Sequence, residues 1–176
     1  MIYLGLDPGM DGAAAWLPTG SRELLSRPGD APLLFRDHVI AAPSRGRQYD
    51  HASFHRALVQ YPPDWSDDEV VAVLEDGPGG PAGMSFTSAR SAGICFGLLL
   101  GVIGCRGWKV VKVRPADWHR ALFGKGVKGD AKARALAFVR DQYPEIDLTV
   151  SGRFRKPHEG FVDAICLAHY GRIKRP

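Results

Sequence analysis

Apolar stretches of strand length and amphipathic stretches of helix length alternate along most of this chain. Residues 2–6 and 12–17 are apolar and are joined by a turn that contains Asp-Pro-Gly, which predicts the two strands of a hairpin. The apolar runs 69–75 and 108–113 predict two further core strands. Helical periodicity, bounded by Pro or Gly, predicts helices over residues 50–63, 87–105, 114–124, 129–144 and 158–174.

The order of these elements indicates an α/β layered fold. Strands come first and then alternate with helices, so we expect one domain over residues 1–176 with a mixed five-stranded sheet that begins antiparallel, continues parallel and is flanked by helices. The third antiparallel strand is expected in the region 18–48, where residues 22–26 and 37–42 are the candidates. In the helix 87–105, Gly93, Gly97 and Gly101 share one side, and we expect that side to approach the sheet.

Composition is that of a soluble globular protein able to bind a polyanion. Of the 176 residues, 45% are hydrophobic and 24% charged, and the net charge is +4. No apolar run approaches the roughly 20 residues that span a bilayer, so no membrane partner is expected. No basic segment precedes an apolar one at the N-terminus, so no secretory signal is expected. The expected location is the cytoplasm of a bacterial or phage-infected cell, with an organelle as the alternative.

Two acids stand where predicted core strands end. Asp7 ends the first strand, and Glu75 ends the strand 69–75. Sites in open α/β sheets gather at the carboxyl ends of the strands, where neighbouring carboxylates would repel each other unless a cation joined them. Oxygen ligands of this kind suit Mg²⁺ or Mn²⁺. The alternative is that Asp7 only makes a turn and that Glu75 is solvated.

The last helix adds two more acids. Glu159 and Asp163 are four residues apart and therefore share a helix face, and the apolar run after Asp163 predicts that this face is partly buried. The alternative is a capping acid followed by a surface acid. His158 is open to three interpretations: a metal ligand, a proton carrier or an exposed residue. Four carboxylates at one place would hold two metal ions about 4 Å apart, an arrangement that hydrolyses phosphodiesters.

Four segments occur in the order found in one nuclease family. GLDPG, VLEDGPG, GKGVKGDAKARALAF and HEGFVDAICLAHYG make the chain resemble RuvC-type Holliday-junction resolvases over residues 1–17 and 69–173. GMSFTSARSAGICFGLLLGV and DAICLAHYG are most similar to the phage and plant-chloroplast members. The resemblance implies a ribonuclease-H-like fold and a homodimer that makes paired symmetric nicks in four-way DNA junctions. It also implies Mg²⁺ or Mn²⁺, two ions per site, and no small-molecule cofactor.

The resemblance assigns the site residue by residue. Asp7, Glu75 and Asp163 match metal ligands of the family. Some members carry the partner acid at the position of Gly160, and others carry an acid or a histidine nearby, so the fourth ligand here is Glu159, His158 or both. The candidate catalytic residues are therefore Asp7, Glu75, His158, Glu159 and Asp163.

Basic loops and two apolar side chains are the candidates for DNA contact. Lysines among flexible glycines make phosphate contacts that are independent of sequence, although such a loop can also be merely solvated. Phe86, with Met84, could wedge into the junction centre, or it could be tucked into the core. Trp108 and Trp118 are expected to be packing residues. The candidate DNA-binding residues are Met84, Phe86, Arg90, Lys125, Lys128, Lys132, Arg134, Arg153, Arg155 and Lys156.

The sequence leaves other functions open. A ribonuclease-H-like nuclease that acts on RNA:DNA hybrid or on branched DNA would use the same acids. A catalytically silent junction-binding protein is an alternative of another class, although uncompensated carboxylates would repel DNA. A phosphotransferase or ATPase is disfavoured, because 176 residues leave no room for two lobes and a second phosphate motif.

Overall fold

The computed structural model describes residues 1–9, 11–19, 33–34, 39–42, 46–59, 69–76, 85–125, 130–149 and 156–176. Its main sheet has the strand order β3-β2-β1-β6-β7. These strands are β1 (Ile2–Asp7), β2 (Ala13–Pro18), β3 (Leu33–Leu34), β6 (Val70–Glu75) and β7 (Lys109–Val113). β1 pairs antiparallel with β2 and parallel with β6, and β6 pairs parallel with β7. The expected change from antiparallel to parallel pairing is confirmed.

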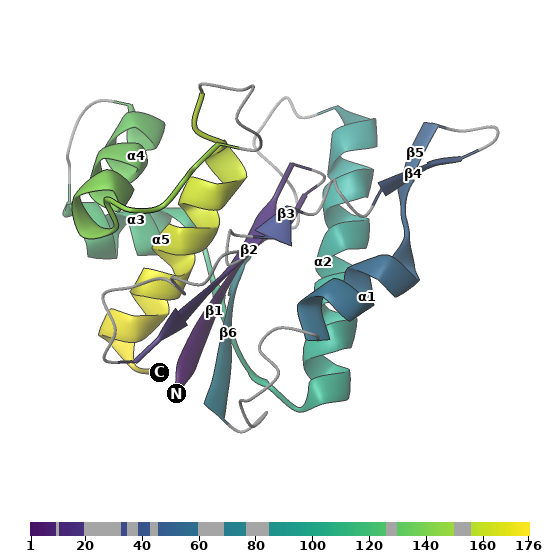
Figure 1. Cartoon of the computed structure of the whole chain (residues 1–176), viewed down its shortest axis with the longest axis horizontal. Helices are drawn as coiled ribbons and strands as arrows, with labels where there is room; N and C mark the ends of the chain where they lie inside the picture. The colour runs from purple at the N-terminus through teal and green to yellow at the C-terminus, as the bar shows by residue number, and fades with distance from the viewer. Residues whose placement is uncertain are drawn as a thin grey trace.

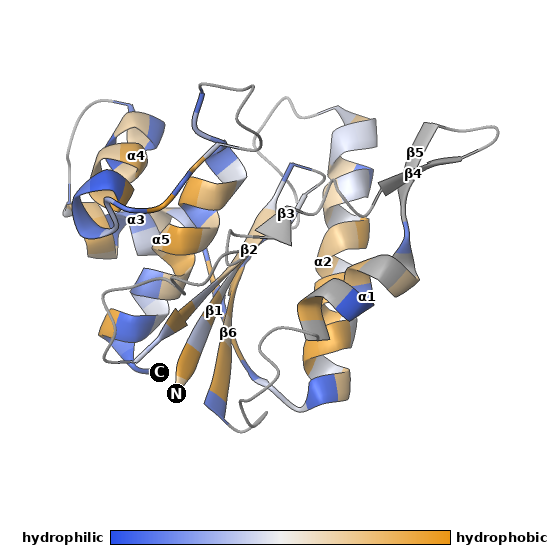
Figure 2. Ribbon diagram, viewed as in Figure 1, coloured by the Kyte–Doolittle hydropathy of each residue, from blue (hydrophilic) through white to orange (hydrophobic). Residues whose placement is uncertain are grey.

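Helices cover both faces of the sheet (Figure 1). α3 (Pro115–Phe123), α4 (Ala131–Gln142) and α5 (Glu159–Lys174) lie on one face, and α1 (His51–Val59) and α2 (Phe86–Arg106) lie on the other. Side chains along β1 alternate between the two faces of the sheet and pack in both hydrophobic clusters. Tyr3 belongs to the cluster under α5, whereas Leu4 and Leu6 belong to the cluster under α2. Apolar residues follow β1, β6 and the middle of α5 in Figure 2.

α5 lies unusually close to the sheet, and glycine makes this possible. A side chain on Gly5 of β1 would place its Cβ 1.9 Å from the carbonyl oxygen of Ala164. A Cβ on Gly171, near the other end of α5, would lie 2.6 Å from Val73 and 2.8 Å from Tyr3. The helix is therefore held against β1 over its length, and its first turn lies at the carboxyl end of that strand.

The third strand differs from the sequence expectation. β3 is a two-residue strand at Leu33–Leu34, so four longer strands carry the sheet. The candidate at 37–42 does not join it, because β4 (Val39–Ala42) pairs with β5 (Gly46–Tyr49) in a separate two-stranded sheet. The candidate at 22–26 lies outside the described residues.

The glycine side of α2 was predicted wrongly. Cys95, Leu99, Val102 and Ile103 face the sheet, whereas a Cβ on Gly93, Gly97 or Gly101 would meet no atom within 4 Å. The bulky side chains occupy the contact with the sheet, which leaves the glycines facing outward. By length and composition alone, α2 could also cross a membrane, so the expectation that the chain contains no apolar run of that length does not hold for this helix. Core helices of soluble proteins can have the same length and composition.

Candidate active site

The parallel pairing of β1 and β6 brings the first two acids to one edge of the sheet. Leu6 is paired with Leu74, so Asp7 and Glu75 follow at equivalent positions on neighbouring strands. Both side chains are partly buried. The sequence expectation that these strand-end acids lie together agrees with the geometry.

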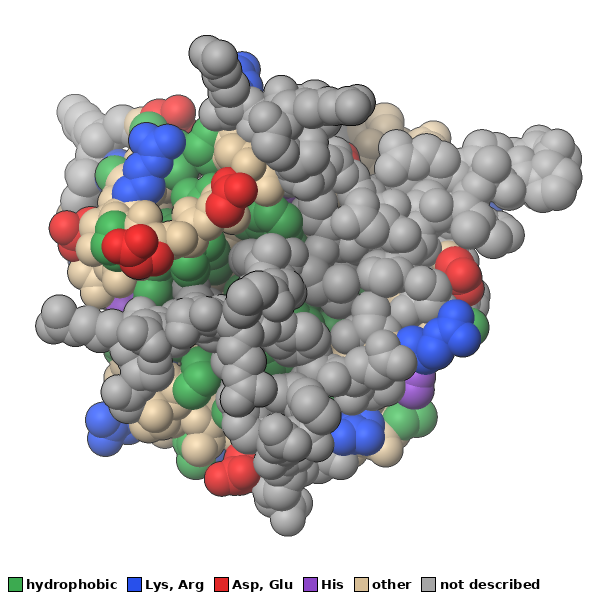
Figure 3. All heavy atoms as spheres, in the orientation of Figure 1, with side chains coloured by type: hydrophobic (Ala, Val, Ile, Leu, Met, Phe, Trp, Pro, Cys, Tyr) green, Lys and Arg blue, Asp and Glu red, His purple; other side chains and the backbone are tan. Residues whose placement is uncertain are grey.

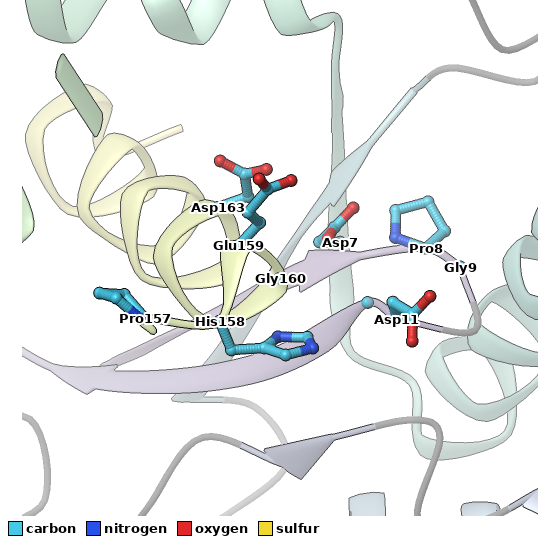
Figure 4. Close-up of a pocket in the computed structure, with 10 residues that line it drawn as sticks. Asp7, Pro8, Gly9, Asp11, Pro157, His158, Glu159, Gly160 and Asp163 are labelled. Carbon is cyan, nitrogen blue, oxygen red and sulfur yellow. The ribbon is translucent and has the colours of Figure 1, made fainter. Parts of the chain in front are cut away.

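α5 begins at the same place and adds the other two acids. A Cβ on Gly160 would lie 2.3 Å from the backbone oxygen of Asp11, so the first turn of α5 abuts the turn between β1 and β2. An acid at position 160 would not fit without a shift of the backbone. The carboxylates of Glu159 and Asp163 extend from one side of α5, and Asp7 lies opposite the helix start (Figure 4).

An open pocket of about 480 Å³ lies among these residues. His158 also lines it, but its ring lies on the other side of the helix start, toward Asp11 (Figure 4). Glu75 does not line this pocket and lies on the neighbouring strand. The full lining is Asp7, Pro8, Gly9, Asp11, Gly12, Pro157, His158, Glu159, Gly160 and Asp163.

The acids destabilise one another's charged forms. Burial, and then the charges of Asp163 and Glu75, raise the pKa of Asp7 well above its usual value. Burial, followed by Glu75 and Glu159, raises the pKa of Asp163 to about 7. Burial also raises the pKa of Glu75. The three carboxyl groups therefore share one electrostatic environment in which each raises the cost of ionising its neighbours.

Lys132 is a positively charged residue at the rim of the pocket. Its ammonium group forms an ion pair with Glu159, and this contact raises the pKa of Lys132. Asp130 caps α4 by accepting a hydrogen bond from the backbone N–H of Lys132 (2.9 Å), which fixes the start of this helix beside α5. Figure 3 shows acidic and basic side chains close together over α4 and the start of α5.

The donor set suits a hard divalent cation, although the ligands are not preassembled. No three His, Cys, Asp or Glu side chains among the described residues are arranged to hold a metal ion as they stand. The partly buried oxygen donors of Asp7, Glu75 and Asp163 nevertheless have raised pKa values, and a divalent cation would remove this repulsion. The residues present therefore fit Mg²⁺ or Mn²⁺ once their side chains close on the ion.

Two residues at the site were not assigned to it from the sequence. Trp118, expected to be a packing residue, is buried with 1% exposure, and its indole N–H also donates to Glu75 Oε2 at 2.8 Å. Asp11 lines the pocket. The turn sequence DPGMDG was a visible signal for Asp11, whereas no local pattern could indicate a bond between residues 75 and 118.

The candidate DNA-binding residues have different outcomes. Phe86 begins α2 and is 83% exposed, so the alternative that it is tucked into the core is wrong. Arg134 is partly buried. The exposed candidates are Arg90, Lys125, Lys132 and Lys156. Met84, Lys128, Arg153 and Arg155 lie outside the described residues.

Solved structures with the same fold exist, although no family model and no curated protein matches the chain. Thermus thermophilus RuvC in complex with Holliday junction substrate is similar over 99% of this chain and 94% of its own, with a TM-score of 0.58 and 18% identity. Another T. thermophilus RuvC structure has a TM-score of 0.55 and 18% identity, covering 99% and 97%. The fold is therefore the ribonuclease-H-like fold of RuvC, as the sequence resemblance implied.

Proposed function

We propose that this protein is a divalent-metal-dependent endonuclease that resolves four-way DNA junctions by paired symmetric nicks. The observation that carries the proposal is the convergence of Asp7, Glu75 and Asp163 from three elements, where burial and then mutual repulsion raise the pKa of Asp7 and of Asp163. Such carboxylates are unfavourable for stability, and a phosphodiesterase that binds divalent ions accounts for them. The RuvC-like fold supports the same substrate class.

Asp7, Glu75 and Asp163 would hold Mg²⁺ or Mn²⁺, with Glu159 as the fourth ligand. Glu159 is preferred to His158 because its carboxylate extends from α5 on the same side as Asp163, whereas His158 is directed toward Asp11. Two bound ions would activate a water molecule and stabilise the departing 3′ oxygen. In the absence of ions, the pair between Lys132 and Glu159 partly compensates the charge at the rim.

Side chains around the pocket would bind the DNA. Lys132 and Lys156 line a second depression that shares Glu159 and Asp163 with the first, so phosphates that approach these carboxylates meet ammonium groups there. Phe86 would insert at the junction centre, since it is an exposed aromatic side chain at the start of a helix. Phe86→Ala should slow cleavage or broaden the choice of cut site without lowering stability. Unchanged rate and cut position would refute this role.

A second copy of the chain is the proposed partner, because symmetric nicks require two sites. The outward face of α2 is the candidate interface, because only 22% of an 18-residue apolar stretch of this helix is buried. Ile94 on this helix is 42% exposed, and the glycines near it have open space around them. Gly97→Glu should shift sedimentation from dimer to monomer. Gln142→Glu, on the exposed end of α4, is the matched control. A variant that sediments like the wild type would exclude this face.

A cleavage panel tests the function. The wild type should nick a four-way junction in the presence of Mg²⁺ or Mn²⁺ far faster than a linear duplex or an RNA:DNA hybrid. Asp7→Asn should abolish cleavage yet retain junction binding, because it removes a ligand charge without changing side-chain size. Preference for the hybrid would favour another ribonuclease-H-like nuclease. Binding without cleavage under every metal condition would favour a silent junction-binding protein.

A further inference from the structure

Trp118 stands out because its bond to the site joins distant parts of the chain. Its indole Nε1 lies 2.8 Å from Oε2 of Glu75, although the two residues are 43 positions apart in the sequence. Backbone pairing brings Glu75 and Trp118 together. Glu75 is in register with Val113 at the end of β7, and the N–H of Asp76 donates to the carbonyl oxygen of Val113 at 2.7 Å. α3 begins at Pro115 immediately afterwards, so its first turn lies next to the end of β6.

The indole ring is held rigidly. Trp118 is 1% exposed and belongs to the hydrophobic cluster under α5. Its ring meets His119 edge to face, with centroids 3.9 Å apart, and Phe123 in the same manner at 6.1 Å. The pyrrole N–H is a donor only, so it cannot bind a cation itself. A fixed donor of this kind sets the orientation of the carboxylate that accepts from it.

We infer that Trp118 is a positioning residue that orients the Glu75 carboxylate for the divalent ion. The hydrogen bond from the indole to Oε2 restricts rotation of the carboxylate, and Oε1 is the oxygen proposed to bind the ion. The inference rests on the proposed function, because it assigns Glu75 to the metal site.

Metal affinity is the first measurement. Trp118→Phe keeps an aromatic ring and removes the N–H, and loss of a partner that orients a ligand weakens metal binding by about 10- to 100-fold. Mn²⁺ binding to the full chain, followed by EPR, should show a loss of this size. Trp108→Phe is the matched control, since Trp108 is a buried tryptophan in the other hydrophobic cluster. Its Mn²⁺ affinity should equal that of the wild type.

A double-mutant cycle separates positioning from general damage. In the Glu75→Gln background, Trp118→Phe should cause no further loss of Mn²⁺ affinity, because the group that it orients no longer carries a charge. A merely structural role predicts the same loss in both backgrounds. Wild-type affinity in Trp118→Phe, or an undiminished loss in the Glu75→Gln background, would overturn the inference.

A measurement on Trp118 itself covers the case in which Trp118→Phe fails to fold. The chain has four tryptophans, and ¹⁵N NMR resolves their indole N–H groups. In the metal-free protein, the Trp118 indole proton should resonate downfield and move upfield in Glu75→Gln. An unchanged Trp118 resonance would overturn the inference. If the wild type bound no Mn²⁺ and cut no junction while the resonance moved, the proposed function would fail and the Trp118–Glu75 bond would stand.

Discussion

The contact between the first turn of α5 and the turn after β1 determines whether the acids converge, and Gly160→Ala tests it. A Cβ at this position would lie 2.3 Å from the Asp11 carbonyl oxygen and 3.1 Å from Gly12 Cα. Both atoms belong to the backbone, so they cannot move aside as a flexible side chain would. The added methyl group should push α5 away from β1 and β2.

The expected loss of stability follows from two opposed terms. Overpacking of this kind costs about 1–3 kcal/mol. Replacing glycine by alanine in a helix gains at most ~1 kcal/mol, and less in the first turn. The net destabilisation should be about 1–2 kcal/mol, which corresponds to a melting temperature lower by roughly 2–8 °C for a chain of this size.

Gly104→Ala is the matched control, because Gly104 lies on α2 and a Cβ at this position would meet no atom within 4 Å. It should raise the melting temperature by up to about 4 °C through helix propensity alone. Mn²⁺ affinity supplies a second measurement: Gly160→Ala should weaken it, since the shift moves Glu159 and Asp163 away from Asp7, whereas Gly104→Ala should not. A Gly160→Ala protein as stable as the wild type, with unchanged Mn²⁺ affinity, would refute the close packing of α5.

Three further predictions concern charge and hydrogen bonding. The pKa of Asp163 rises from 3.8 to about 7 on folding, so its favourable contribution to folding stability is present below about pH 4 and lost as the pH rises toward 7. Saturating Mg²⁺ should therefore raise the melting temperature more at about pH 8 than at about pH 5. Equal rises at the two pH values would contradict this. The Tyr143 hydroxyl and His169 Nδ1 form a hydrogen bond of 2.7 Å, so Tyr143→Phe should cost about 0.5–1.5 kcal/mol in denaturant unfolding, with Tyr170→Phe on α5 as the control that changes less. Burial lowers the pKa of His169 from 6.5 to about 4, so its contribution to folding stability is present above about pH 6.5 and lost as the pH falls toward 4. The stability of the wild type should therefore fall faster over this pH range than that of His169→Gln. An equal fall in both proteins would show that His169 is not the titrating group.

Continuous apolar runs bounded by turn residues were sufficient to predict most of the core elements. The hairpin of β1 and β2, the core strands β6 and β7 and the helix α5 all form near their predicted ranges. The strand-end positions of Asp7 and Glu75 followed from the same pattern, because the direction of parallel strands decides which ends meet. The i, i+4 spacing likewise brought Glu159 and Asp163 to one side of α5.

Tertiary competition decided the features that the pattern missed. The glycines of α2 could have faced either the sheet or the outside, and Leu99 and Val102 gain more by burial than a closer backbone contact would. β4 pairs with the adjacent segment β5 rather than with the main sheet, because pairing with a neighbouring segment closes a smaller loop. The bond from Trp118 to Glu75 depends on the register of β6 and β7, which no local window contains.

The site combines features that oppose each other energetically, and this suggests how folding and metal binding are linked. Close packing at Gly5 brings α5, and with it Asp163, up to Asp7 at the end of β1. The helix N-terminus stabilises the charge of Glu159, but Asp163 lies one turn further and gains less from the dipole. Apolar burial under α5 must therefore offset repulsion among the acids until a cation binds. A cation that binds only the folded chain removes this penalty, so metal binding should stabilise the whole layer that α5 covers.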